Sequence, residues 1–137
     1  MFGTSRTPIS AYRNVSIETN VASASPHGLV TLLFEGARQA ILVARAGIEA
    51  GDVPRKGSAI TRAIDIILNG LRASLDLEQG GNVAQNLYAL YDYMARRLLH
   101  ANLKNDTAAL DEVLKLLSEI HEAWVSIGDK TNGASSS

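Results

Sequence analysis

The chain has 137 residues, which fits a single domain with a core of ordinary size. Thirteen Lys and Arg nearly balance fourteen Asp and Glu, so no basic excess favours nucleic acid as a partner. Cysteine is absent, which excludes disulfides and thiolate metal sites and suits a reducing compartment. The start, MFGTSRTPIS, lacks the apolar core of a signal peptide, and no apolar run approaches the ~20 residues that cross a bilayer. We therefore expect a cytoplasmic protein without membrane insertion.

The first predicted helix begins after the segment SASP and ends near Gly51. Ser25 suits the N-cap position, and Pro26 suits the first helical turn, where its missing N–H costs no hydrogen bond. Gly51 suits a C-terminus because glycine readily adopts the left-handed backbone that ends many helices. The apolar residues between these ends recur with a helical period, as Leu29, Leu33, Ala37, Ala40, Ala44 and Ile48.

A second and a third helix are predicted on either side of a glycine pair, Gly80 and Gly81. Asp52 can cap the second helix and Pro54 lies in its first turn, while Asn82 can cap the third. The apolar stripe of the second helix runs through Ile60, Ile64, Ile67, Leu71 and Leu75. The stripe of the third runs through Val83, Leu87, Leu90, Met94, Leu98 and Ala101.

A fourth helix and two outer segments complete the predicted organisation. Asp106 can cap the fourth helix, whose stripe comprises Leu110, Val113, Leu117, Ile120, Trp124 and Ile127. Short connections make successive helices antiparallel neighbours, so we expect an all-α fold, an up-down-up-down four-helix bundle over residues 26–127. Residues 1–25 hold too few apolar side chains to fold alone and are expected to dock on the bundle. The Gly/Ser-rich residues 128–137 are expected to be disordered.

The second and third helices carry more apolar side chains than a bundle interior requires. Ile66 and Leu77 lie off the second stripe. On the third helix a further stripe, with Tyr91 at its edge, contains Ala84, Tyr88, Ala95 and Leu99. These residues either widen the buried face or form a groove for an amphipathic helix of another chain. Clustered tyrosine favours the groove because tyrosine is enriched at interfaces, but periodicity leaves both interpretations open.

No pattern for catalysis or cofactor binding occurs in the sequence, so we expect neither an enzyme nor a cofactor. The histidines His27, His100 and His121 are not at metal-ligand spacing, and no glycine-rich phosphate loop or nucleophile elbow occurs. One alternative is a histidine phosphotransfer module that uses His100. Its His-Ala-Asn-Leu-Lys-Asn sequence is one residue longer than the pattern of those domains and lacks their glycine. Another alternative is a structural bundle whose surplus apolar face forms a weak homodimer.

Four stretches carry a resemblance: SASPHGLVTLLFEGA, GDVPRKG, LDLEQGGNVAQNLYALYDYMARRLLHANLKND and EAWVSI. Together they are similar to the flagellar secretion chaperone family, from about Ile9 to about Ile127, with the motifs in order and at matching spacing. The string from the glycine pair to Met94 is the most specific part. Phe34 stands where tyrosine is common in the family, and the serine-rich tail is peculiar to this chain.

The resemblance implies a four-helix bundle that binds the C-terminal segment of flagellin in the bacterial cytoplasm. It implies that such binding prevents premature polymerisation and assists delivery to the export gate of the flagellar type III apparatus. It suggests a flagellin-binding surface formed by Ile66, Leu77, Asn86, Tyr88, Tyr91, Ala95 and Leu99. The pattern I-x-A-Y, matched by Ile9 and Tyr12, suggests an N-terminal segment that covers part of the groove and later docks at the gate.

Overall fold

A computed structural model of the chain describes the backbone of residues 25–136 and the side chains of residues 25–127. This part of the chain is helical apart from short connections, as predicted, and it contains no strand. The elements are α2 (Pro26–Ala50), α3 (Val53–Asp65), the π-helical η3 (Ile66–Leu71), the 3₁₀ turn η4 (Arg72–Ser74), α4 (Gly81–Lys104) and α5 (Thr107–Ser136). The segment predicted to dock on the helices, with Ile9 and Tyr12, lies outside the described residues.

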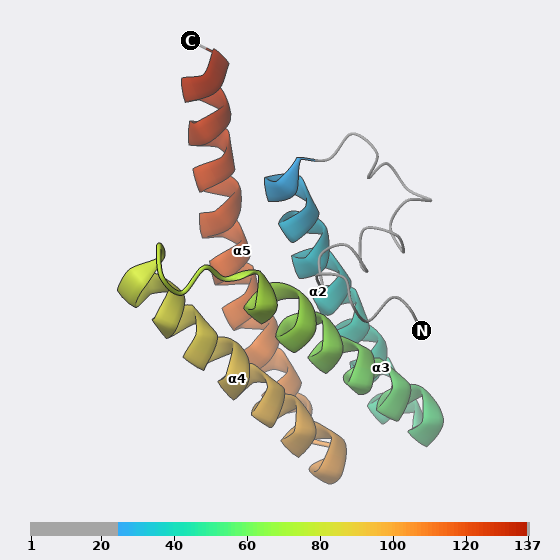
Figure 1. The fold of residues 1–137 in the computed structure, drawn as a ribbon. Coiled ribbons are helices and arrows are strands. Elements are labelled where there is room, and N and C mark those ends of the chain that lie inside the picture. Colours follow the sequence, from blue (N-terminus) through green and yellow to red (C-terminus); the bar gives the residue numbers. More distant parts are fainter. Residues whose placement is uncertain (1–24, 137) are drawn as a thin grey trace, which may run out of the picture.

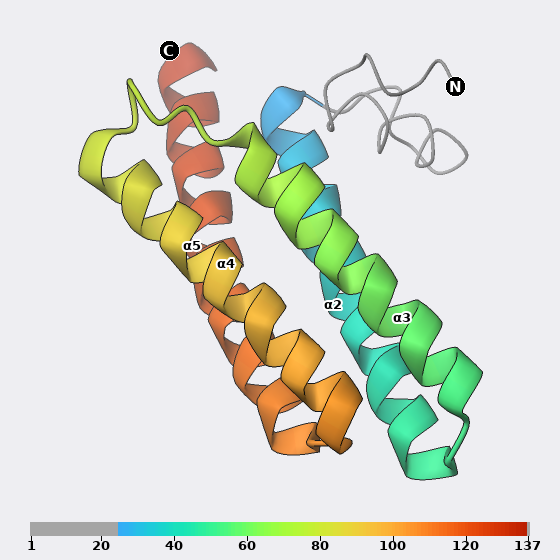
Figure 2. The ribbon, with the colours of Figure 1, turned by 60° about the horizontal axis from the view of Figure 1, so that its bottom comes forward.

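Successive helices run in opposite directions and lie side by side (Figure 1, Figure 2). α2 packs against α3 and α5, and α4 packs against α5 and the α3–η3 segment, so the core lies between all four helices. The upper end in Figure 1 combines the start of α2, the end of η4 and the start of α4. α5 continues past this end to Ser136, whereas the sequence predicted a helix end near Ile127 and a disordered tail from 128 to 137.

The predicted helix caps are confirmed at three helix starts and one helix end. At each start, a side-chain oxygen accepts a hydrogen bond from the backbone N–H three residues later. The pairs are Ser25 with Gly28 (3.1 Å), Asp52 with Arg55 (3.2 Å) and Asp106 with Ala109 (3.3 Å). Gly51 ends α2 with a φ of 69°, in the left-handed region. The predicted cap at Asn82 is wrong, because α4 already begins at Gly81 and no side chain caps it.

The second helical segment ends earlier than predicted. Regular α-helix stops at Asp65, and the π turn η3 and the 3₁₀ turn η4 carry the chain only to Ser74, not to Gly80. A turn organised by Asp76 follows, since its carboxylate accepts the backbone N–H groups of Glu78 (3.2 Å) and Gln79 (3.0 Å). This turn lies in residues 75–80, which connect the end of η4 to the start of α4.

The core confirms most of the predicted apolar positions but shifts the inward face of α4. Val83, predicted in the core stripe, is 69% exposed, and Leu87 and Leu90 are only half-buried. The buried residues of α4 are Ala84, Tyr91, Met94, Ala95, Leu98 and Ala101. Part of the supposed second stripe therefore belongs to the interior, because neighbouring helices contact α4 from two sides.

The opposite end of the molecule is closed by a buried lysine that the sequence did not indicate. Lys56 is 8% exposed, and its ammonium donates to the Asn102 carbonyl (3.0 Å) and to the Asn105 side-chain oxygen (2.7 Å) at the C-terminus of α4. The negative end of a helix dipole favours a cation at this place. α2 approaches α3 closely here, since a Cβ on Gly47 would lie 2.9 Å from the backbone nitrogen of Lys56.

Candidate functional site

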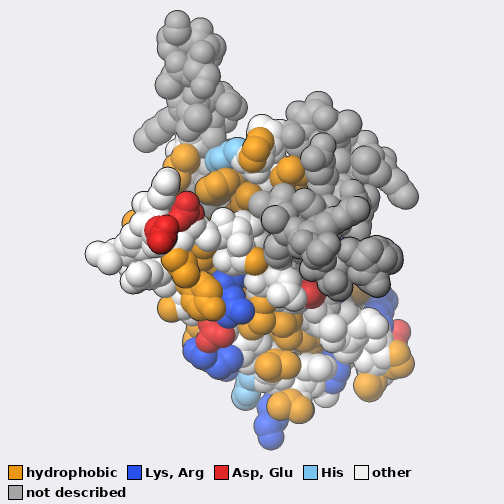
Figure 3. Space-filling model, viewed as in Figure 1, with side chains coloured by type: hydrophobic (Ala, Val, Ile, Leu, Met, Phe, Trp, Pro, Cys, Tyr) orange, Lys and Arg blue, Asp and Glu red, His pale blue; other side chains and the backbone are white. Residues whose placement is uncertain are grey.

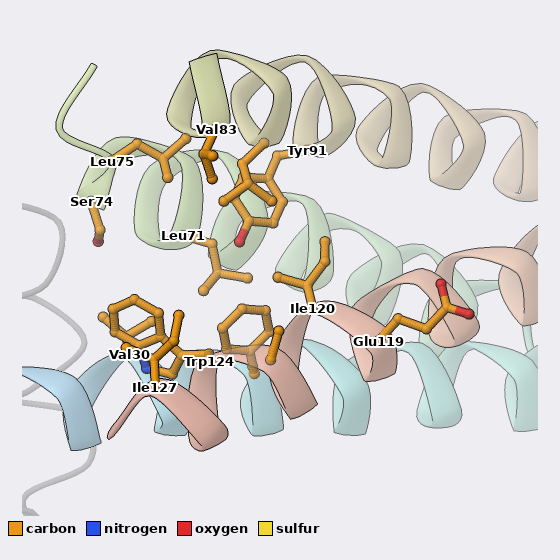
Figure 4. A pocket seen from close by; sticks show the side chains of 13 residues that line it. Val30, Leu71, Ser74, Leu75, Val83, Tyr91, Glu119, Ile120, Trp124 and Ile127 are labelled. Atoms are coloured by element: carbon orange, nitrogen blue, oxygen red, sulfur yellow. The ribbon is translucent and has the colours of Figure 1, made fainter. Parts of the chain in front are cut away.

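An apolar cavity of about 360 Å³ opens at the end of the molecule where η4 and α4 are separated. Four regions of the chain line it: the start of α2, the end of the η3–η4 segment, the first turns of α4 and the later turns of α5 (Figure 4). The lining residues are Val30, Phe34, Leu71, Ser74, Leu75, Val83, Leu87, Tyr91, Glu119, Ile120, Ala123, Trp124 and Ile127. Such a concave apolar surface can bury large apolar side chains of a guest.

The mouth of the cavity is exposed, whereas its inner wall is part of the core. Val83 and Ile127 are more than half exposed, whereas Phe34, Leu71 and Tyr91 are almost fully buried. On the face shown in Figure 3, hydrophobic side chains reach the surface in patches between charged ones. A guest could therefore bury the rim residues without unfolding the inner wall.

Two aromatic stacks hold α2 and α5 together beside the cavity. The His27 and Trp124 rings are parallel with centroids 4.2 Å apart, and the Phe34 and His121 rings are parallel at 5.1 Å. The Trp124 indole N–H also donates to the His27 carbonyl oxygen at 3.0 Å. These contacts place the Trp124 and Phe34 rings in the cavity wall and fix their orientation.

Tyr91 contributes a buried phenol to the same wall. Burial raises the pKa of Tyr91 above its ordinary value, so the side chain is neutral throughout the physiological pH range. Of the described residues that line the cavity, only Glu119 carries a charged side chain, and Ser74 adds a hydroxyl. The site therefore offers contact area for apolar groups and very little for polar recognition.

The residues predicted as a flagellin-binding surface fall into three groups. Tyr91 alone lines the cavity. Ile66 and Ala95 lie in the interior, at 2% and 4% exposure, and not at the surface as predicted. The remaining four, Leu77, Asn86, Tyr88 and Leu99, are exposed outside the cavity lining. Tyr88 is covered on one face by Arg72, whose guanidinium carbon lies 4.6 Å from the ring centroid.

Sequence reasoning missed most of the residues that line the cavity. Trp124, Ile120 and Ile127 were assigned to the core stripe of the fourth helix, and Val83 to that of the third. One signal was available: the apolar arc from Leu116 to Ile127 is wider than a bundle interior requires. The arc alone does not reveal a cavity, because the opposite wall of the cavity is formed by residues at the end of the η3–η4 segment.

His100 has a local partner at the α4–α5 connection. The His100 Nε2 lies 3.2 Å from the carboxylate of Asp106, which also caps α5. The neighbouring Arg97 is paired as well, because its Nε donates to Glu112 at 2.8 Å. These contacts hold the end of α4 to the start of α5.

The described residues hold neither a cluster of metal ligands nor a membrane-spanning helix. Among residues 25–127, no group of three or more His, Cys, Asp or Glu side chains could hold a metal ion. No described helix is both long enough and apolar enough to cross a membrane. The apolar cavity is thus the main candidate site of the described part of the chain.

Fold and cavity together define a helical protein with an apolar site at one end of its described part. A family model described as Flagellar protein FliS matches residues 8–131 of the chain. A relative from Salmonella typhimurium, named Flagellar secretion chaperone FliS, is 56% identical over 90% of this chain and 92% of its own length. A relative of the same name from Escherichia coli is 46% identical over 83% of this chain and 84% of its own length. Another of that name, from Bacillus subtilis, is 34% identical over 85% of this chain and 83% of its own length. The chain belongs to the FliS family of flagellar secretion chaperones.

Proposed function

We propose that the chain is an export chaperone that binds the C-terminal segment of flagellin at the apolar cavity. The observation that carries the proposal is this cavity, open at its rim and lined almost entirely by apolar side chains, in a member of a secretion chaperone family. A flagellin segment held in this way is kept from premature polymerisation in the cytoplasm. It is then delivered to the export gate of the flagellar type III apparatus.

The energetics support a guest with several large apolar anchors. A segment that is disordered when free loses about 2–5 kcal/mol or more on ordering. Each large apolar side chain moved from water into the cavity contributes about 1.5–3 kcal/mol. Two or three anchors therefore offset the ordering cost, and a longer guest gains further contacts on the exposed Leu77, Tyr88 and Leu99.

The N-terminal segment has a proposed role at the same site. Residues 1–24 precede Ser25, which caps α2 at the end of the molecule where the cavity opens. We propose that Ile9 and Tyr12 cover part of the cavity when no flagellin is bound and dock at the export gate afterwards. Residues 26–127 act as one up-down-up-down bundle in this scheme.

The test is calorimetric titration of the full chain with a C-terminal segment of flagellin from the same bacterium. Val83→Glu places a carboxylate on the rim of the cavity, where the valine is exposed and its loss leaves the core intact. Because the guest would bury this position, affinity is expected to fall about ten- to hundredfold. The wild-type chain should give a one-to-one complex with a negative heat-capacity change.

Val53→Glu is the matched control for the rim variant. Val53 is 65% exposed, close to the 69% of Val83, and both residues lie in the first turn of a helix. The helix dipole therefore acts with the same sign on both new carboxylates, whereas Val83 lines the cavity and Val53 does not. Equal affinities of the two variants would refute binding at the cavity. Self-association of the free chain that Val83→Glu abolishes would favour the structural dimer instead.

A further inference from the structure

A second concave surface lies along the outer side of α2 and α3, and it shares no residue with the cavity. The groove holds about 510 Å³ between two helices that run side by side (Figure 2). Its lining residues are Gly36, Gln39, Ala40 and Val43 from α2 and Arg55, Ser58, Ala59 and Arg62 from α3. Both sets follow the spacing i, i+3, i+4, i+7, so each helix contributes one continuous stripe.

The shape of the groove fits a helix. Ala40 and Ala59 are buried and form a floor of methyl groups, and Val43 is 39% exposed at one edge. Small floor side chains let another backbone approach closely, and two parallel stripes guide a rod-shaped ligand along the groove. The rim side chains Gln39 and Ser58 are exposed and able to hydrogen-bond.

The charge of the groove is of one sign. Arg55 and Arg62 are the charged residues of its described lining, which includes no carboxylate. Both side chains are exposed, and neither forms an ion pair with a described residue. Four other arginines do pair with aspartate or glutamate, namely Arg45, Arg72, Arg96 and Arg97. Among the described residues, the two groove arginines therefore have no carboxylate partner, and both can pair with carboxylates of another protein.

We propose that the α2–α3 groove docks an acidic amphipathic helix of a partner protein. Arg55 and Arg62 are seven residues apart, so their side chains are spaced by about 10.5 Å along α3. Two carboxylates seven residues apart on a guest helix match this spacing, with small apolar residues between them facing the alanine floor. The chain's own segment 1–24 is a poor occupant by charge, since it carries Arg6 and Arg13 against the single acid Glu18.

The test uses fluorescence anisotropy with a designed helical peptide that carries two glutamates seven residues apart and alanines facing the floor. The full chain is expected to bind this peptide about tenfold more tightly than an otherwise identical peptide with glutamines, as expected of two exposed ion pairs. The preference should shrink as ionic strength rises, because salt screens exposed charges. Equal affinity for the two peptides, or no detectable binding of either, would overturn the proposal.

Paired variants locate the binding. Arg55→Glu combined with Arg62→Glu should abolish binding of the glutamate peptide and create binding of a lysine version. The control is Arg38→Glu, which reverses one charge at an exposed position of α2 outside the groove. This variant should bind the peptide with an affinity within about twofold of the wild-type value. Val83→Glu should also leave it unchanged, which separates this surface from the proposed flagellin site.

Two results would assign the groove to a different occupant. A change in the sedimentation mass of the free chain on double charge reversal would assign it to a second copy. Amide NMR shift changes in residues 1–24 on the same reversal would assign it to the chain's own segment. Either result would overturn the proposal of an acidic partner.

Discussion

Replacement of Gly47 with alanine is expected to destabilise the fold, although the same change inside a helix usually stabilises. The usual gain is about 0.5–1 kcal/mol, because alanine loses less backbone entropy than glycine on folding. At Gly47 the new Cβ would lie 2.9 Å from the Lys56 nitrogen and 3.1 Å from its Cα. Neither atom can move freely, because the backbone N–H of Lys56 donates to the carbonyl oxygen of Asp52 (3.0 Å). The side chain of Lys56 is also held by its hydrogen bonds to the end of α4.

The expected magnitude follows from the two opposing terms. Forcing an extra methyl group into a tightly packed contact costs about 1–3 kcal/mol. Subtracting the helix-propensity gain of about 0.5–1 kcal/mol leaves a net loss of about 0–2.5 kcal/mol in the free energy of unfolding. Urea unfolding followed by circular dichroism measures this difference directly, with an unchanged m-value as the check for two-state behaviour.

Gly57→Ala provides the matched comparison. Gly57 also lies inside a helix, but a Cβ there would have no atom within 4 Å. This variant is expected to be more stable than the wild-type chain by about 0.5–1 kcal/mol. If Gly47→Ala proved as stable as Gly57→Ala, the close approach of α2 and α3 at Lys56 would not be a constraint on the fold.

Two further predictions concern α5. Hydrogen bonds from Tyr93 and Arg97 hold the pKa of Glu112 below its usual range, so their stabilisation is present at neutral pH and is lost as pH falls through the folded pKa. When the pH is lowered from neutral to below about 4, the free energy of unfolding measured in urea should therefore fall less for Glu112→Gln than for the wild-type chain. An equal fall in the two proteins would contradict this prediction. Trp124→Phe keeps an aromatic ring beside His27 but loses the indole N–H bond, so thermal unfolding should show about 1 kcal/mol of destabilisation; an unchanged midpoint would contradict it.

The features predictable from sequence were those that depend on a few neighbouring residues. Ser25, Asp52 and Asp106 were predicted as caps because a short polar side chain can satisfy an N–H group three residues away. Gly51 was predicted because its backbone conformation is unfavourable for other residues. All-helical structure followed from apolar periodicity over long segments.

The cavity was not predictable, because its shape depends on contacts between distant segments. Periodicity identifies the apolar arc of a helix but not which half of that arc faces the core. Val83 and Tyr91 exchanged their expected positions, one at the surface and one buried, because α4 is contacted by two neighbours. Lys56 was missed for the same reason, since its partners Asn102 and Asn105 lie on another helix.

The π-helical segment η3 has a consequence for how the cavity tolerates changes in chain length. The Arg72 N–H donates to the Ile67 carbonyl, five residues back, so the turn contains one residue more than an α-helical turn. Deletion of one residue between Ile66 and Leu71 would restore ordinary helix while keeping the following residues in phase with α3. Leu71, Ser74 and Leu75 would then keep their positions in the cavity wall, because the extra residue is taken up within the π turn. The cavity wall therefore tolerates a change of one residue in this turn.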